Sequence, residues 1–95
     1  MEFKDRGTAD IYDGIDSKVA RRTLPAQLHQ AATDLLDHID SASSLADFAS
    51  VPGNRFHKLS GNRAGQYSLS INMQYRICFY WTDQGAIDVE IIDYH

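Results

Sequence analysis

The chain has 95 residues, of which 43% are hydrophobic and 11% aromatic, and its formal net charge is −4. This length is too short for several domains, so we expect a single domain over residues 1–95. No apolar run approaches the roughly 20 residues that cross a bilayer, and a lone Cys78 forms no internal disulfide, so we expect Cys78 in the core. Because the first residues lack the basic-then-apolar order of a secretory signal, we expect a soluble, cytoplasmic protein.

Charged residues are unevenly distributed along the chain. Residues 1–47 contain nine acids and five bases, residues 48–82 contain four bases and no acid, and residues 83–95 contain four acids. The charges of the three segments are therefore −4, +4 and −4. A basic segment in an acidic protein suits local contact with phosphates better than general coating of DNA, although chance composition of a β-rich segment would give the same pattern.

The N-terminal half predicts helices. Residues 1–4 are expected to form a short edge strand, and residues 5–12 a brief helix that ends near Gly14, because glycine adopts a left-handed conformation at low cost. Thr23 resembles a helix N-cap, with Pro25 in the tolerated first turn. The helix that follows has an apolar stripe at helical spacing, formed by Leu28, Ala31, Ala32, Leu35, Leu36 and Ile39.

The C-terminal half predicts an antiparallel sheet. An irregular or helical connector at residues 41–50 and a turn at residues 51–54 precede it. Segments rich in β-branched and aromatic residues then alternate with short polar turns, at residues 55–59, 66–72, 75–82 and 87–94. Such short connections favour antiparallel pairing, since parallel strands need a long crossover. We therefore expect an α+β fold, with two N-terminal helices packed on a four- or five-stranded, mainly antiparallel sheet.

Motifs spread along nearly the whole chain resemble those of one toxin family. They are residues 3–11, Leu24-Pro25, Pro52-Gly53-Asn54-Arg55-Phe56, residues 59–72, Tyr75-Arg76-Ile77-Cys78-Phe79 and residues 88–95. The motifs are fairly specific, and although no single one would suffice, their order, their spacing and the closing Asp93-Tyr94-His95 together resemble the HigB branch of the RelE/ParE toxin superfamily. The resemblance implies a RelE-like fold.

The same resemblance implies a function in a type II toxin–antitoxin system. Members of the branch are ribosome-dependent mRNA endonucleases that inhibit translation and are neutralised by a helix-turn-helix antitoxin of the HigA type. The implied partners are that antitoxin, the ribosome and mRNA, with operator DNA bound only through the antitoxin complex and no membrane. Two alternatives stay open: a catalytically weakened binding module that acts as antitoxin partner or co-repressor, and a gyrase inhibitor like the ParE relatives. Ser60, where some HigB relatives carry lysine, and the acidic net charge make the weakened module possible.

Cleaving RNA without a metal requires a base for the 2′-hydroxyl proton, cations for the crowded phosphorane and an acid for the departing 5′ oxygen. His95 is the first candidate, because histidine changes its protonation near neutral pH, and Asp93 would orient His95 or act as the base. A frayed chain end is the alternative for both. Arg76, among apolar neighbours, would either hold the scissile phosphate or pair with Asp93 or another acid on the neighbouring strand.

Further candidates come from the resemblance and from residue type. The resemblance implies a catalytic role for His57, although an exposed strand histidine would look the same. Tyr94 and Tyr67 would stack on or hydrogen-bond to RNA, and Tyr67 fits the core nearly as well. His29 and His38 have no cysteine nearby, so we expect no metal and no cofactor. The cations assigned to RNA phosphates are Arg55, Lys58 and Arg63.

Overall fold

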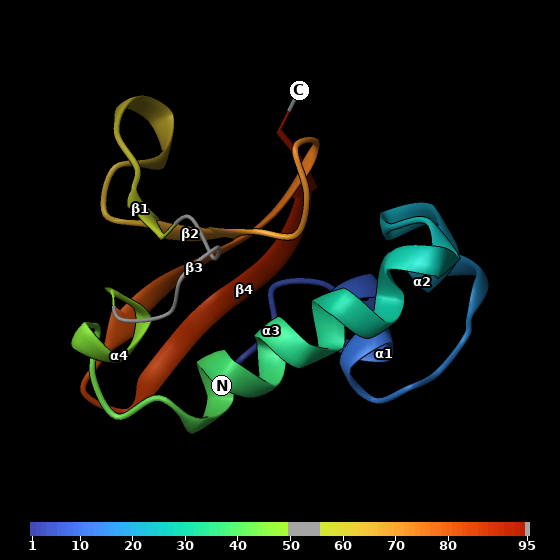
Figure 1. Ribbon diagram of the computed structural model, residues 1–95, viewed down its shortest axis with the longest axis horizontal. Helices are drawn as coiled ribbons and strands as arrows, with labels where there is room; N and C mark the ends of the chain where they lie inside the picture. The colour runs from blue at the N-terminus through green and yellow to red at the C-terminus, as the bar shows by residue number, and fades with distance from the viewer. Residues whose placement is uncertain (50–55, 95) are drawn as a thin grey trace.

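The computed structural model describes residues 1–49 and 56–94, and the helices lie on one side of a four-stranded sheet (Figure 1). The N-terminal part forms α1 (Arg6–Tyr12), α2 (Lys18–Thr23), the 3-10 turn η1 (Ala26–Leu28), α3 (His29–Ser41) and α4 (Ala46–Ala49). The C-terminal part forms β1 (His57–Lys58), the 3-10 turn η2 (Gly61–Arg63), β2 (Tyr67–Ser70), β3 (Tyr75–Thr82) and β4 (Gly85–Asp93). The α+β prediction is confirmed, in its four-stranded form.

Local signals explain where α1 begins and ends. The Asp5 carboxylate accepts a hydrogen bond of 2.7 Å from the backbone N–H of Thr8, which satisfies one of the free donors in the first turn. Gly14, just past the helix, has a φ of 75°, in the left-handed region that glycine reaches without strain. The predicted short helix and its glycine stop are therefore confirmed.

The prediction that Thr23 caps the long helix was wrong. Thr23 is the last residue of α2, and its hydroxyl donates to the carbonyl oxygen of Val19 at 2.8 Å. The N-cap of α3 is Leu28, which makes no side-chain capping hydrogen bond, whereas Ser17 caps α2, its hydroxyl accepting from the N–H of Ala20 at 3.0 Å. A buried, extended Leu24 then ends α2, and α3 begins only after η1. The basic cluster that follows Ser17 is thus a helix of its own, which the sequence interpretation missed.

The apolar stripe of α3 is narrower than predicted. Ala32, Leu36 and Ile39 are buried, whereas Leu35 is half-buried and Ala31 is exposed. None of the helices formed by the described residues has the length and apolar character needed to cross a bilayer.

The sheet has the order β1-β2-β3-β4 and all its strand pairs are antiparallel. The strand β3 has the bounds predicted for it, while β1 and β2 are shorter than the predicted segments and β4 begins earlier. The predicted N-terminal edge strand is reduced to a single parallel bridge between Phe3 and Val89. Three backbone hydrogen bonds accompany this bridge: Glu2 N–H to Ala86 O at 3.0 Å, Val89 N–H to Glu2 O at 3.0 Å and Lys4 N–H to Val89 O at 2.9 Å.

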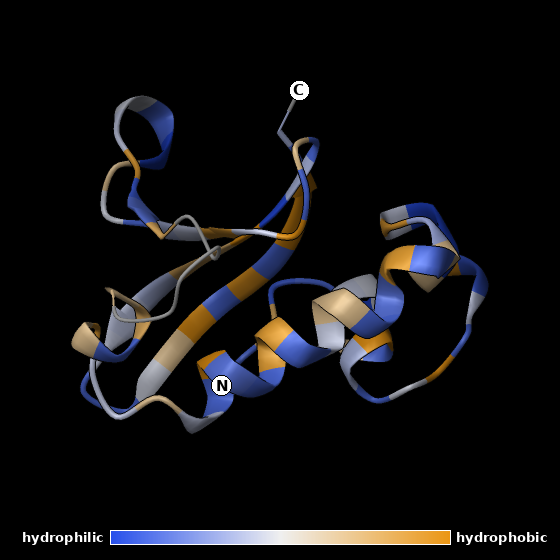
Figure 2. Ribbon diagram, viewed as in Figure 1, coloured by the Kyte–Doolittle hydropathy of each residue, from blue (hydrophilic) through white to orange (hydrophobic). Residues whose placement is uncertain are grey.

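The two faces of the sheet differ in character. Alternating hydrophobic and hydrophilic residues are visible along β4 in Figure 2. Leu69, Ile77 and Ile91 stand opposite one another on three strands and belong to the core shared with α3. The other face, which we call the polar face, carries Ser68 and Glu90 in the next row. Strand pairing therefore places Ser68 and Glu90 on the face opposite the core that the sheet shares with α3.

Candidate functional site

Residues from three separate segments surround a hollow of about 300 Å³ at the edge of the polar face. The lining residues are His57, Lys58, Leu59, Ser60, Arg76 and Tyr94. We call this the polar hollow. Strand register explains the grouping, because His57 of β1 stands opposite Ser68 of β2, and Ser70 of β2 stands opposite Arg76 of β3. The structure thus brings four of the predicted site residues together.

Arg76 is held in the polar hollow by neutral groups. Its Nη1 donates a hydrogen bond of 3.1 Å to the Ser68 hydroxyl, and its Cζ lies 4.3 Å from the centroid of the Tyr94 ring. A guanidinium over an aromatic face is attracted by the negative charge density of the ring. The ion pairs among residues 1–49 and 56–94 do not include Arg76, so the pairing with Asp93, which was the alternative to phosphate binding, is not formed there. Its charge is available to an anion in the hollow.

The chain end that carries Asp93 and Tyr94 is fastened to the turn between β2 and β3. The Tyr94 N–H donates to the carbonyl oxygen of Gln74 at 2.7 Å, and the Gln74 side-chain amide donates to Asp93 at 3.0 Å. Up to Tyr94 the chain end is therefore not frayed. Asp93 is exposed and does not line the polar hollow. The prediction for His95 lies outside the described residues.

The predicted RNA-binding residues have different surroundings. Lys58 is exposed and lines the polar hollow. Arg63 points elsewhere, with Nη2 at 3.2 Å from a Glu90 carboxylate oxygen and Nη1 at 2.9 Å from the Gln66 side-chain oxygen. Its charge is balanced by a buried acid. Arg55, like His95, lies outside the described residues.

Tyr67 belongs to an aromatic cluster. Its ring stacks on Phe56 with centroids 5.4 Å apart and an interplanar angle of 6°, and it lies 6.3 Å from Phe79. Phe48 of α4 also stacks on Phe56, with ring centroids 5.3 Å apart. The geometry favours the packing role that was left open for Tyr67.

The sequence interpretation missed a buried acid on the polar face. Glu90 is only 6% exposed, and its second carboxylate oxygen lies 2.8 Å from the Lys4 ammonium, opposite the contact with Arg63. A hydrogen bond from the ammonium to Glu90, together with the charge of that carboxylate, raises the pKa of Lys4. Alternating polar residues in β4 are the signal that could have indicated this acid. We call the three residues the Glu90 triad.

Two other features place limits on the chemistry. Cys78, opposite Glu90, is fully buried as predicted, and burial raises the pKa of its thiol to about 11. Such a thiol stays protonated at neutral pH and is a poor nucleophile. In the described ranges, 1–49 and 56–94, no group of three His, Cys, Asp or Glu side chains is placed to hold a metal ion.

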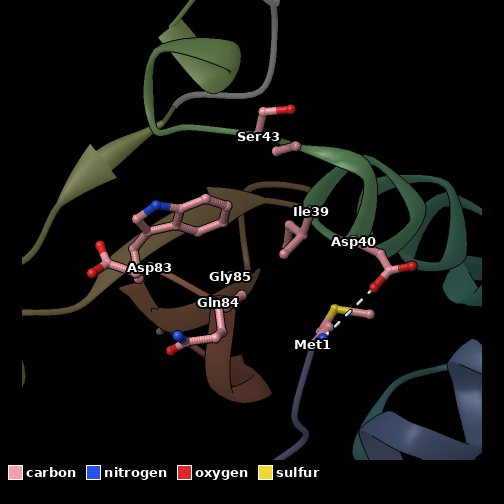
Figure 3. A pocket seen from close by; sticks show the side chains of 10 residues that line it. Met1, Ile39, Asp40, Ser43, Asp83, Gln84 and Gly85 are labelled. Atoms are coloured by element: carbon pink, nitrogen blue, oxygen red, sulfur yellow. Dashed lines mark ion pairs between the residues drawn. The ribbon is translucent and has the colours of Figure 1, made fainter.

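A second hollow lies near the turn between β3 and β4, close to the end of α3 (Figure 3). Its volume is about 240 Å³, and its lining includes Trp81, Asp83 and Asp40. The Asp40 carboxylate lies 3.7 Å from the terminal amine of Met1, the contact dashed in Figure 3. None of the predicted site residues that lie within 1–49 and 56–94 lines this second hollow.

Comparison with known proteins places this geometry in a family. The model of a family described as "RelE-like toxin of type II toxin-antitoxin system HigB" matches residues 1–95. Toxin HigB-1 of Vibrio cholerae is 36% identical over 88 residues, which cover 93% of this chain and 90% of that protein. Endoribonuclease HigB of Proteus vulgaris is 29% identical over 94 residues, which cover 98% and 96%. The chain therefore belongs to the HigB-like toxins, the RelE-like toxins of type II toxin–antitoxin systems.

A solved structure has the same fold. The YoeB–YefM complex from Staphylococcus aureus matches with a TM-score of 0.62, covering 99% of this chain and 93% of the matched chain. The sequence identity is 20%, so this likeness speaks for the fold alone. The predicted RelE-like fold and the HigB resemblance are both confirmed.

Proposed function

We propose that this chain is a ribosome-dependent mRNA endonuclease that inhibits translation and needs no metal ion for the chemical step. The observation that carries the proposal is the polar hollow, where Arg76 has no acid partner among the described residues and lies beside a histidine, a lysine and a tyrosine. Such a site can bind a phosphate and exchange protons with the groups attached to it. A relative that is named an endoribonuclease supports the same reaction class.

Within this proposal, each residue type has a role that its chemistry allows. Arg76 binds the scissile phosphate through its planar fork of N–H donors. His57, which is exposed in the polar hollow, exchanges protons with the ribose hydroxyl or the leaving oxygen. Asp93 and His95 complete the acid–base set, and Tyr94 supports Arg76 and offers its outer face to RNA.

RNA binding outside the hollow is assigned to the remaining cations. Lys58, which lines the hollow, contacts a backbone phosphate, and Arg55 extends the same basic stretch. Arg63 contributes less to phosphate binding than an unpaired arginine would, because Glu90 balances its charge. Tyr67 acts indirectly, by supporting Phe56 next to β1.

The proposed partners follow from membership of a two-component family. We infer that a helix-turn-helix antitoxin of the HigA type binds and neutralises this chain in the cytoplasm, and that operator DNA is bound through that complex. The matched structure from Staphylococcus aureus is a complex of two proteins, which supports an antitoxin partner.

The proposal is tested by adding the purified chain to a reconstituted translation system and mapping cuts in the ribosome-bound message. The wild-type chain should cut, and Arg76→Ala should reduce cutting by at least about 100-fold, the cost typical of removing one charge-stabilising group. Arg22→Ala, which removes an exposed arginine of α2, is the matched control and should cut normally. If no metal ion is needed for the chemical step, the chain should keep its cleavage activity after it has been treated with a chelator and the chelator has been removed.

Three outcomes would refute the proposal. Intact message in the wild-type reaction, with antitoxin binding preserved, would indicate a binding module. Double-strand breaks in DNA without RNA fragments would indicate a gyrase inhibitor. Wild-type cleavage by Arg76→Ala would show that Arg76 does not bind the scissile phosphate in the polar hollow.

A further inference from the structure

Arg76 is supported by a residue that has no part in the site as predicted from the sequence. Ser68 is 0% exposed, and its hydroxyl oxygen accepts the Nη1–H of Arg76 at 3.1 Å. We propose that Ser68 is a positioning residue, which together with the Tyr94 ring fixes the plane of the Arg76 guanidinium toward the polar hollow. This inference rests on the proposed endonuclease function, whose phosphate-binding group it concerns.

The position of Ser68 in the sheet makes it a rigid acceptor. It lies on β2, between His57 of β1 and Cys78 of β3, and is paired with both. Because β2 is hydrogen-bonded to a strand on each side, its backbone is fixed, and the Ser68 oxygen can move only by rotation about χ1. A buried hydroxyl also needs a hydrogen-bond partner. Arg76 is the partner that the structure provides.

The Tyr94 ring fixes the second direction. The hydrogen bond to Ser68 fixes one nitrogen of the guanidinium, and the ring face, 4.3 Å from Cζ, fixes the tilt of its plane. Two contacts of different direction restrict a planar group far more than either one alone. A pre-oriented fork loses less conformational freedom when it binds the two oxygens of a phosphate.

Both supports are neutral, which preserves the charge of Arg76. Arg63 shows the contrasting arrangement, since a buried carboxylate at 3.2 Å neutralises it and fixes it in place. An acid at the position of Ser68 would hold Arg76 equally well, but it would repel a phosphate in the hollow. A serine supplies the acceptor without the negative charge, so orientation and anion binding are compatible.

The neighbouring serine on the same strand provides a matched control. Ser70 stands directly opposite Arg76 in the register between β2 and β3 and is half-buried. The hydrogen bonds among the described residues join Arg76 to Ser68 and not to Ser70. Ser68→Ala and Ser70→Ala therefore remove the same atom from the same strand, and only the first removes a contact with Arg76.

The experiment measures cleavage of ribosome-bound message by the wild-type chain, Ser68→Ala and Ser70→Ala. For Ser68→Ala we expect kcat to fall about 10-fold with KM nearly unchanged, because orientation matters most in the transition state. Ser70→Ala should stay within about twofold. In the background of Arg76→Ala, Ser68→Ala should have no further effect, since the interaction it removes is already absent. Equal, additive losses in both backgrounds would overturn the proposal.

A second readout does not depend on catalysis. The side-chain N–H signals of Arg76 in nitrogen-15 NMR report whether its guanidinium is held, and they should be broadened by exchange in Ser68→Ala but not in Ser70→Ala. Unchanged signals in Ser68→Ala would overturn the positioning role even if the chain cuts RNA. If the wild-type chain leaves message intact while the signals respond as expected, the endonuclease proposal fails and the positioning of Arg76 stands.

Folding is controlled in the same samples. Ser68→Cys, assayed with a reductant because Cys78 stands opposite, replaces the oxygen by a slightly larger and weaker acceptor, so it should reproduce the cleavage defect of Ser68→Ala. A melting temperature within a few degrees of wild type in either variant makes the kinetic comparison valid. Wild-type cleavage by a folded variant of either kind would also overturn the proposal.

Discussion

Replacing Glu90 by glutamine tests how strongly the Glu90 triad stabilises the fold. The carboxylate is 6% exposed and accepts from Arg63, whose side chain is 34% exposed. Removing one partner of a fully buried ion pair costs about 3–5 kcal/mol, because the other charge is left without a partner. Here the cost is smaller, since water would reach Arg63 once Glu90 is replaced by glutamine. Glutamine also keeps one acceptor oxygen, so the loss is closer to a hydrogen bond with a charged group, about 2 kcal/mol. For a domain of this size, this lowers Tm by about 8–16 °C.

The assay is thermal unfolding followed by circular dichroism, at low and high salt. Asp88→Asn is the matched control, because it removes one negative charge from an exposed side chain on the same strand. The control should change Tm by less than about 2 °C, and its effect should vanish in salt, whereas the effect of Glu90→Gln should persist because buried pairs are weakly screened. Equal Tm values for the two variants would refute the reasoning.

Three other substitutions or reactions probe separate parts of the structure. Because burial raises the pKa of Cys78 to about 11 from 9.0, iodoacetamide at pH 9 should alkylate the native chain at least about 50-fold more slowly than the urea-unfolded chain; equal rates would show that the thiol is not buried. Phe48→Ala should lower the free energy of unfolding by about 3–5 kcal/mol in urea titrations, since Phe48 is 1% exposed, while Met73→Ala at 89% exposure should leave it unchanged. Tyr94→Phe keeps the ring that contacts Arg76 and should cleave message at nearly the wild-type rate, whereas Tyr94→Leu should slow cleavage about 10-fold. Equal cleavage rates for the two variants would exclude a role for the ring.

Regular patterns account for the parts of the fold that were predicted. The strand β3 is long and rich in β-branched and aromatic residues, and α3 carries an apolar stripe, so both elements were predicted from the sequence. The helix α2 was missed because its six residues bury a single side chain, Ala20, and thus show no stripe. A capping signal at Ser17 was present, but Thr23 offered an equally plausible one.

Four residues that line the polar hollow were named from the sequence, but their contacts were not predicted. Likeness to a family pointed to His57, and residue chemistry pointed to Arg76 and Tyr94, yet sequence spacing alone gives no register between strands. The support of Arg76 by Ser68 depends on that register. The contact between Lys4 and Glu90 is harder still to predict, because it joins the two ends of the chain through a parallel bridge.

The bridge between Phe3 and Val89 also affects how the molecule meets other copies of itself. β4 is the last strand of the sheet, and an uncovered last strand offers its free N–H and C=O groups to any passing chain. Residues 2–4 occupy those groups as far as Val89, and the Thr8 hydroxyl accepts the next free donor, the N–H of Ile91, at 3.1 Å. The first turn of α1 and the segment before it thus cover the edge of β4 and prevent it from pairing with the edge strand of another molecule. A chain without residues 1–4 should form soluble oligomers or precipitate at concentrations where the full chain stays monomeric.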